Sequence, residues 1–328
     1  MTECDMIKAF TGKFPRSLQQ LNTPFECDSE LIRIGDQTWA VTIDDFSPEE
    51  DLFTMENPEQ LGANLAVATL SDLLAAGADP QFFMHAVSVP ADIEETVLNG
   101  LSDGIRKTLA QANCHLIGGD LGQSETWRYC GVAMGPVTVA GPLTRRLTGA
   151  PGTLWVTGCL GDANLAALTG APTPRFELRT REAQLIRQHA TASMDTSGGL
   201  MDALWTMHQL SPEVRINLHT DAIPMAEGIR QAAQATGIPP ETALTAGAGE
   251  YELLFATDRN ISDSVREEFA SLAITPVADL SIDAESGIYI YRHGRLINRM
   301  DSPPPCPRTT GSRQDYINAV TEFTASLF

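Results

Sequence analysis

The pattern of hydrophobic and polar positions along residues 1–140 predicts alternating strands and helices. The letters GDQ at 35–37 separate two short apolar runs and predict a hairpin, and Asn57 followed by Pro58 is typical of a helix start. Strands are expected at 31–34, 38–43, 82–89, 115–117 and 128–139, and helices at 58–76 and 92–113. This ββαβαββ order indicates an α+β domain with an antiparallel or mixed sheet.

A junction rich in Gly, Pro and Thr at 141–152 precedes a second alternating series. There, strands are expected at 154–157, 214–218, 252–257, 274–277 and 288–291, and helices at 178–189, 200–209, 226–235 and 262–272. Four prolines between 303 and 307 break the chain before a last helix near 314–327. We therefore divide the chain into residues 1–145, residues 146–300, and a Pro-rich linker with a C-terminal helix at 301–328.

Composition narrows the function classes. The 328 residues include 42 acidic and 22 basic ones, a formal net charge of −20, which disfavours nucleic acid as a partner. No apolar run approaches the roughly 18 residues of a membrane span, and the first ten residues carry acids where a secretory signal carries bases. The six cysteines show no zinc-like spacing and are interpreted as reduced, mostly buried thiols of a cytoplasmic protein.

Lysine is scarce, which bears on nucleotide binding. The chain has only Lys8, Lys13 and Lys107, and the single Gly-Lys pair is followed by Phe14 rather than by Ser or Thr. A protein of this sequence that handles nucleotides does so without a P-loop.

Asp72 is the most distinctive candidate residue. It is the only charged residue between Leu61 and Ala78, in a predicted helix that is apolar nearly all round. Such a helix is normally buried, and a buried carboxylate is costly unless it is paired or binds a metal ion. Two interpretations stay open here, a metal ligand and a structural pair with Ser71 that bonds backbone amides or an arginine.

Other acids flank the predicted strands. Asp44 and Asp120 end the strands WAVTID and HLIGGD, and Asp28 precedes the first strand. Gly118 and Gly119 let a phosphate approach the backbone closely, although Gly-Gly-Asp alone is more often a turn. Four acids on separate elements, without histidine or cysteine nearby, favour magnesium over zinc.

Two further segments stand out in the second half. In SMDTSGGL, Asp195 and Ser197 precede a predicted helix start, a place that suits a phosphate group, and an ordinary helix cap is the alternative. In TAGAGEYELLF, small residues lead into a strand that carries Glu250 and Glu252, and a loop followed by an ordinary strand is the alternative.

Five segments in this order resemble the aminoimidazole ribonucleotide synthetase superfamily and are most similar to its thiamine-monophosphate kinases. They are ATLSDLLAAGADP, LIGGDLG, GAPGTLWVTGCLGDANLA, MDTSGGLMDAL and GEYELLF. The resemblance covers about residues 25–280. It implies a first domain that forms a barrel with its copy in a homodimer, a second substrate domain, and ATP held through magnesium ions in the cleft between the domains.

The resemblance also assigns roles to matching positions. It implies four magnesium ligands, Asp28, Asp44, Asp72 and Asp120. Gly118, Gly119 and Arg146 are implied as phosphate contacts, and Asp195 and Ser197 are implied to lie beside the transferred phosphoryl group. The implied acceptor is a small phosphate ester, thiamine monophosphate first.

The chain departs from the kinase pattern at three places. Gly198 stands where the kinases have aspartate, Gly249 precedes Glu250 where they have a Glu-Asp pair, and Cys27 stands beside Asp28 in place of a second aspartate. The sequence therefore predicts a magnesium-dependent, ATP-using small-molecule kinase. It leaves open an ATP-dependent cyclase or dehydratase of the same superfamily and a nucleotide-binding protein that does not catalyse.

Overall fold

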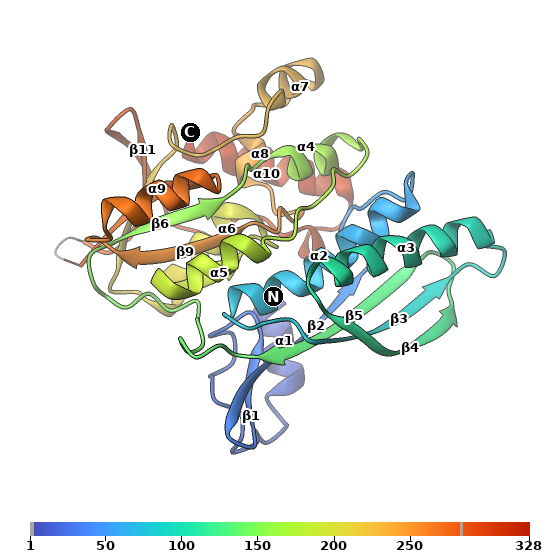
Figure 1. The fold of residues 1–328 in the computed structure, drawn as a ribbon. Coiled ribbons are helices and arrows are strands. Elements are labelled where there is room, and N and C mark those ends of the chain that lie inside the picture. Colours follow the sequence, from blue (N-terminus) through green and yellow to red (C-terminus); the bar gives the residue numbers. More distant parts are fainter. Residues whose placement is uncertain (1–2, 283–284) are drawn as a thin grey trace.

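The computed structural model describes residues 3–282 and 285–328, and within them two mixed sheets form the framework of the molecule (Figure 1). The first sheet has the strand order β1-β2-β5-β3-β4, and the second has the order β12-β11-β8-β10-β6-β9-β7. The predicted α+β architecture with two such parts is confirmed. The domain boundaries at 145 and 300 stay a prediction. In the sequence, all strands of the first sheet precede residue 145 and all strands of the second sheet follow it.

The N-terminal sheet has the predicted ββαβαββ connectivity. In its opening hairpin Ile34 pairs with Gln37, so that only Gly35 and Asp36 form the turn, and Gly35 takes a φ of +60°. The β3–β4 pair is parallel and the other pairs are antiparallel. The strands are β1 (Glu30–Ile34), β2 (Gln37–Phe46), β3 (Phe82–Val89), β4 (His115–Gln123) and β5 (Arg128–Pro136).

Helix α2 (Pro58–Ala75) lies between the first sheet and the second part of the molecule. Asn57 caps it as predicted, because its side chain accepts a hydrogen bond from Gln60 N. Every residue from Leu61 to Ala75 is buried. Helix α3 (Glu95–Gln111) packs closely on α2, since a Cβ on Gly104 would lie 2.6 Å from the Ala63 nitrogen.

The second sheet carries helices on both sides (Figure 1). Its strands are β6 (Gly152–Thr157), β7 (Ala190–Asp195), β8 (Arg215–His219), β9 (Leu253–Asp258), β10 (Ile274–Ser281), β11 (Gly287–Arg292) and β12 (Arg295–Met300). Its helices are α4 (Asp162–Thr169), α5 (Thr180–His189), α6 (Gly199–Leu210), α7 (Ile229–Thr236), α8 (Thr242–Thr245) and α9 (Asp263–Ser271). Elements β7, α4, α8 and β12 were not expected from the sequence, nor was helix α1 (Glu3–Thr11) at the N-terminus.

Two predicted strand ends were wrong, and both affect candidate residues. Strand β4 continues through Gly118 and Gly119 to Gln123, so that Asp120 lies inside the strand instead of ending it. Strand β2 likewise continues past Asp44 to Phe46. The strands run on because their backbone groups pair along the whole neighbouring strands, which a local glycine pair does not prevent.

The C-terminal tail folds against the second domain. It contains the short 3-10 helix η1 (Pro307–Thr309) and helix α10 (Arg313–Leu327), which begins with a capping box formed by Ser312 and Asp315. Tyr316 is buried, and its hydroxyl accepts a hydrogen bond of 2.7 Å from Gly247 N. Packing of α10 on α8 therefore joins the tail to the loop before β9.

The structure bears on two expectations drawn from the sequence, one about membrane spans and one about the burial of the cysteines. Among the described residues, none of the helices combines the length and apolar character that crossing a membrane requires. The cysteines are less buried than expected: Cys27 and Cys114 are buried, Cys130 and Cys306 are half-buried, and Cys159 is exposed. All five are free thiols, and the side chain of Cys4 lies outside the described ones.

Candidate metal and phosphate site

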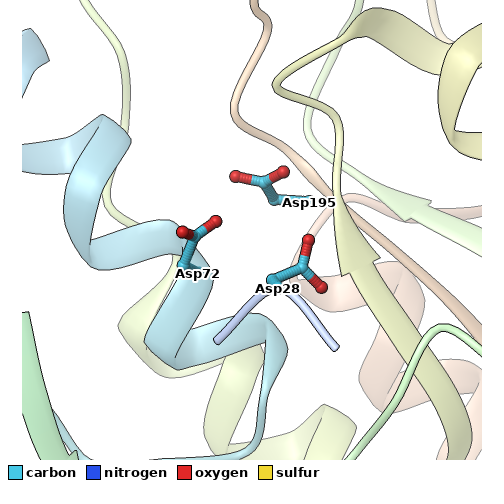
Figure 2. Close-up of side chains that lie close together, drawn as sticks. All are labelled: Asp28, Asp72 and Asp195. Carbon is cyan, nitrogen blue, oxygen red and sulfur yellow. The ribbon is translucent and has the colours of Figure 1, made fainter. Parts of the chain in front are cut away.

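Three carboxylates from distant parts of the chain converge where the two domains meet (Figure 2). Asp28 comes from the loop before β1, Asp72 from α2 and Asp195 from the end of β7, and one carboxylate oxygen of each lies within 4.8 Å of the others. The Asp28 side chain has no exposed surface, and Asp72 and Asp195 are 9% and 0% exposed. We refer to these three residues together with Asp44 as the acid cluster.

Hydroxyl groups orient two of these carboxylates. Thr42 on β2 donates a hydrogen bond of 2.5 Å to Asp72 Oδ2, and Ser71 on α2 donates one of 2.5 Å to Asp195 Oδ2. The other oxygen of Asp195 accepts from the backbone nitrogen and the hydroxyl of Ser197, at 3.1 and 2.7 Å. The Ser71 bond thus joins the first domain directly to the end of β7.

Asp28 has one paired and one unpaired oxygen. Arg145 donates to its Oδ1 from Nη2 at 2.8 Å and from Nε at 3.2 Å. Asp28 Oδ2 is buried without any hydrogen-bond partner in the described structure. A buried carboxylate oxygen in this condition is costly unless a cation approaches it, so the donor set fits a metal ion.

The electrostatics of the cluster point the same way. Burial raises the pKa of Asp28 to about 6, against the attraction of Arg145. Burial, followed by the charge of Asp195, raises the pKa of Asp44 to about 7, and burial with the charge of Asp44 raises the pKa of Asp72 well above its usual range. Carboxylates that repel one another in this way gain from a divalent cation, and an all-oxygen ligand set suits magnesium.

Asp120 lies apart from this cluster within one chain. In the register of the sheet it stands level with Ala86 on β3 and Cys130 on β5, and through them with Asp45 on β2. That row is three strand spacings long, roughly 14 Å. Asp120, Ala86 and Asp45 are exposed, whereas the alternate row holds Asp44, so Asp120 points to the face of the sheet opposite α2.

The glycines before Asp120 share its exposed position. Every residue of β4 is exposed, and a Cβ on Gly118 would meet no atom within 4 Å. A Cβ on Gly119 would clash with the ring of His85 on the neighbouring strand, at 2.9 Å from its Nε2. Gly118 therefore leaves open backbone, while Gly119 is explained by packing against β3.

Arg146 also lies outside the cluster. Its Nε pairs with Glu26 at 3.3 Å, and its Nη1 donates to the carbonyl oxygen of Leu210 at 2.6 Å. The arginine that contacts the cluster is its neighbour Arg145, which sequence reasoning missed. Adjacent residues of an extended segment point in opposite directions, and the sequence does not say which of the two faces inward.

The glutamates of the GEYELLF segment have structural partners. Glu250 Oε1 accepts from Gly161 N at 2.9 Å and Asn164 N at 3.1 Å, which caps the start of α4. Glu252 Oε2 accepts from Thr157 Oγ1 at 2.5 Å and from Arg179 Nε at 2.6 Å. The structure thus agrees with the reading of this segment as a loop followed by an ordinary strand.

A separate cavity of about 320 Å³ lies between the start of α2 and the loop before α5. It is lined by Thr54, Glu56, Asn57, Gln60, Leu61, Asn64, Pro172 and Thr173. None of the four acids of the cluster lines it, so the cavity and the cluster are distinct features.

Comparison with known proteins gives a family match for the N-terminal part of the chain. Residues 27–137 match the family model described as AIR synthase related protein, N-terminal domain. This part of the chain is an AIR synthase related domain. The match spans the predicted strands, α2 and the Asp28, Asp44, Asp72 and Asp120 positions, so the resemblance inferred from the five segments is confirmed.

Relatives and solved structures extend the likeness beyond the AIR synthase related domain. Thiamine-monophosphate kinase of Pyrococcus horikoshii is 27% identical over 308 residues, covering 90% of this chain and 93% of the relative. The Escherichia coli K12 enzyme of the same name is 26% identical over 297 residues, covering 82% and 87%. These relatives support a kinase-like function.

Two solved structures show the shared fold. AaThiL complexed with AMPPCP and TMP superimposes with a TM-score of 0.70 at 19% identity, covering 89% of this chain and 93% of that one. Escherichia coli HypE, a hydrogenase maturation protein, superimposes with a TM-score of 0.69 at 19% identity, covering 94% and 99%. The fold of nearly the whole chain is therefore shared with AaThiL and HypE.

Proposed function

We propose that this protein is a magnesium-dependent phosphotransferase that uses ATP to phosphorylate a small phosphate ester, thiamine monophosphate being the first candidate. The observation that carries the proposal is the convergence of Asp28, Asp72 and Asp195 at the junction of the domains, with Asp28 Oδ2 buried and unpaired. The thiamine-monophosphate kinase relatives supply the choice of acceptor.

The proposed roles of the residues follow from their contacts. Asp28, Asp44, Asp72 and Asp195 would hold magnesium, which neutralises charge on the phosphates during transfer. Thr42 and Ser71 fix the carboxylates of Asp72 and Asp195 with hydrogen bonds, and Arg145 fixes Asp28. Burial of the cluster keeps water away, which strengthens every charge interaction in the site.

Ser197 is proposed to act through Asp195. Both its backbone nitrogen and its hydroxyl donate to Asp195 Oδ1, at the turn that leads into α6. Four residues lie away from the cluster within one chain, namely Arg146, Gly118, Gly119 and Asp120. Their roles toward phosphate and metal therefore remain predictions.

We further propose that the chain forms a homodimer in the cytoplasm through the face of the first sheet opposite α2. Large apolar side chains on this face are exposed, among them Ile43 at 68% and Met84 at 39%. Light scattering after gel filtration tests this proposal. Ile43→Glu is expected to convert a dimer to a monomer, whereas a wild-type monomer would contradict it.

Two other functions have support from particular observations. The likeness to HypE favours another ATP-dependent reaction of the superfamily, a cyclisation or dehydration. Gly198, at the place where the kinases have aspartate, favours a protein that binds nucleotide without catalysis. Incubation with magnesium, ATP and thiamine monophosphate separates them, because only the kinase yields ADP together with a newly phosphorylated acceptor.

A thermal-shift experiment tests the metal and nucleotide part of the proposal. ATP with magnesium is expected to raise the melting temperature much more than ATP with EDTA, since only ligand that binds the folded protein stabilises it. Equal stabilisation in the two buffers would remove the metal-bridged site.

A further inference from the structure

The C-terminal tail brings an arginine to the acidic segment of the first domain. Arg308, in η1, places its Nη2 at 3.2 Å from Asp51 Oδ1 and at 3.4 Å from the carbonyl oxygen of Asp45. Its Nε lies 3.9 Å from Glu50 Oε2. Helix α10, which follows η1, packs on α8 and β12, so Arg308 brings a positive charge from the tail to the acidic segment 44–51.

Arg308 lies beside the part of β2 that carries Asp44, because the Asp45 carbonyl that it contacts belongs to the next residue of the strand. The same guanidinium opposes the effect of burial on the pKa of Asp51. Arg308 therefore lies next to the strand segment that contributes Asp44 to the cluster.

The guanidinium has the properties of a phosphate-binding group. It is 35% exposed, while the Asp51 side chain that it contacts is only 9% exposed. The other oxygen of Asp51 accepts a hydrogen bond of 2.8 Å from Ser47 N, so the acidic segment has internal order of its own. A guanidinium carries five donors in a plane and suits phosphate oxygens, and no lysine lies in residues 44–51 or in the tail.

We propose that Arg308 is a phosphate-binding residue of the site, supplied by the C-terminal tail. When phosphates enter the acid cluster, its guanidinium exchanges its long contacts with Glu50 and the Asp45 carbonyl for a phosphate oxygen. The inference rests on the proposed function in that it requires a phosphate ligand at the cluster. The phosphate belongs either to the nucleotide or to the acceptor, and the experiment distinguishes the two.

Isothermal titration of the full chain tests the proposal. Wild type, Arg308→Gln and Arg308→Lys are titrated with AMPPCP plus magnesium, with pyrophosphate plus magnesium, with thiamine monophosphate and with thiamine. The matched control is Arg292→Gln, since Arg292 is similarly exposed at 36% and pairs with Glu241 at 3.2 Å, far along the second sheet.

We expect Arg308→Gln to weaken at least one phosphate ligand by about tenfold or more, in line with the loss of a hydrogen bond between charged groups. Arg308→Lys should recover part of the affinity, thiamine should be unaffected, and Arg292→Gln should match wild type. Loss with AMPPCP and pyrophosphate assigns Arg308 to the nucleotide, and loss with thiamine monophosphate assigns it to the acceptor.

Other outcomes overturn the inference. Unchanged binding of every phosphate ligand by Arg308→Gln refutes it, as does an equal loss for thiamine, which would indicate a structural tail. If wild type binds magnesium-AMPPCP but does not phosphorylate thiamine monophosphate, the proposed acceptor fails while the Arg308 comparison remains decisive. If wild type binds none of the phosphate ligands, both proposals fail.

Discussion

Asp72 joins the two halves of the acid cluster at the scale of single residues. It lies on a helix with Ser71, whose hydroxyl bonds Asp195 of the second domain, and it receives its own hydrogen bond from Thr42 on β2. Burial and the neighbouring carboxylates, Asp44 first, raise its pKa, so a proton or a cation relieves the repulsion. The metal-ligand interpretation of this residue is thus testable without changing the fold.

Asp72→Asn is expected to leave a folded protein. Without metal its free energy of unfolding should change by less than about 1–2 kcal/mol, because removing a repelled charge offsets the altered hydrogen bond. Binding of magnesium-AMPPCP should weaken at least tenfold, as measured by calorimetry. Asp103→Asn, on the exposed surface of α3, is the control and should bind like wild type. An unfolded Asp72→Asn protein would instead support the structural interpretation.

Gly198 permits a second residue-scale experiment. Its φ is −85°, so the backbone accepts a side chain there, in contrast to Gly199 with a φ of +81°. The place next to it is filled by Asp202, whose Cγ would lie 2.9 Å from an added Cβ. A carboxylate from the first turn of α6 thus stands close to where the kinases carry their aspartate.

Gly198→Asp alone is therefore expected to be crowded by Asp202. We predict that Gly198→Asp/Asp202→Ala gains magnesium affinity or slow ATP hydrolysis relative to Gly198→Asp, since one carboxylate then occupies the place without a repelling neighbour. Metal titration and ADP release check this prediction. If wild type already phosphorylates thiamine monophosphate robustly, aspartate at this position is dispensable.

Single residues also show where the sequence stops being informative. Asp72 was found because one charge in an apolar helix is conspicuous. A place for Asp195 beside the transferred phosphoryl group stays a prediction, and its closeness to Asp28 and Asp72 was not foreseen, because strand pairing across the second sheet decides its place. Arg145 was passed over for Arg146, since the direction of each side chain depends on the backbone angles of a loop.

At the scale of elements, α4 depends on Glu250 for its start. The helix has no side-chain cap of its own, and Glu250 accepts from Gly161 N and Asn164 N instead. Burial raises the pKa of Glu250 well above its usual range. A neutral acceptor should therefore serve as well as a carboxylate.

Glu250→Ala is expected to lower the free energy of unfolding by about 1–3 kcal/mol, the cost of leaving buried donors without a partner. Glu250→Gln should stay within about 1 kcal/mol of wild type because its side-chain oxygen still accepts. Urea denaturation of the metal-free proteins measures both changes. Should Glu250→Gln lose nucleotide binding while it remains stable, Glu250 would have a role in the site as well.

Elements were predicted well where the apolar pattern was strong. Strands β1, β2 and β3 and helices α2 and α3 were expected within a few residues of their observed bounds. Strand β12 was missed because four of its six residues are exposed and polar residues alternate weakly. Strand β4 was cut short at its glycines, and without its register the opposite-facing position of Asp120 could not be foreseen.

For the whole molecule, the acid cluster makes the domain junction sensitive to pH. In the metal-free protein the pKa of Asp28 rises from 3.8 to about 6 and that of Asp44 from 3.8 to about 7. Between pH 4 and 7 the folded protein thus holds protons that the unfolded chain has released. These groups stabilise the fold at low pH, and their contribution is lost as the pH rises through 6 and 7.

We therefore expect the stability of the metal-free protein to depend less on pH when Asp44 is replaced by asparagine. Urea denaturation between pH 4 and 7 in EDTA should show a steeper fall in stability for wild type than for Asp44→Asn. Other carboxylates, such as Glu26 and Asp315, have a lowered pKa and contribute equally to both proteins. The difference between the two slopes therefore reports on Asp44. Magnesium should flatten the wild-type fall by replacing protons. Identical slopes for both proteins would contradict the prediction.

The whole architecture was accessible from the sequence only through resemblance. Periodicity gave the elements of each half, but the convergence of residues 28, 72 and 195 depends on how two sheets meet along α2. The hydrophobic pattern does not predict how two sheets pack against one helix. Five motifs in order did indicate the fold, through the resemblance to the superfamily.

The position of Arg308 near the end of the chain has a consequence during synthesis. A ribosome makes the tail after every described strand of both sheets, and domains begin to fold as they emerge. The acid cluster can therefore assemble before its tail arginine exists. A nascent chain arrested before residue 308 would hold four crowded acids with Arg145 alone, so it should depend more strongly on cellular magnesium than the released protein does.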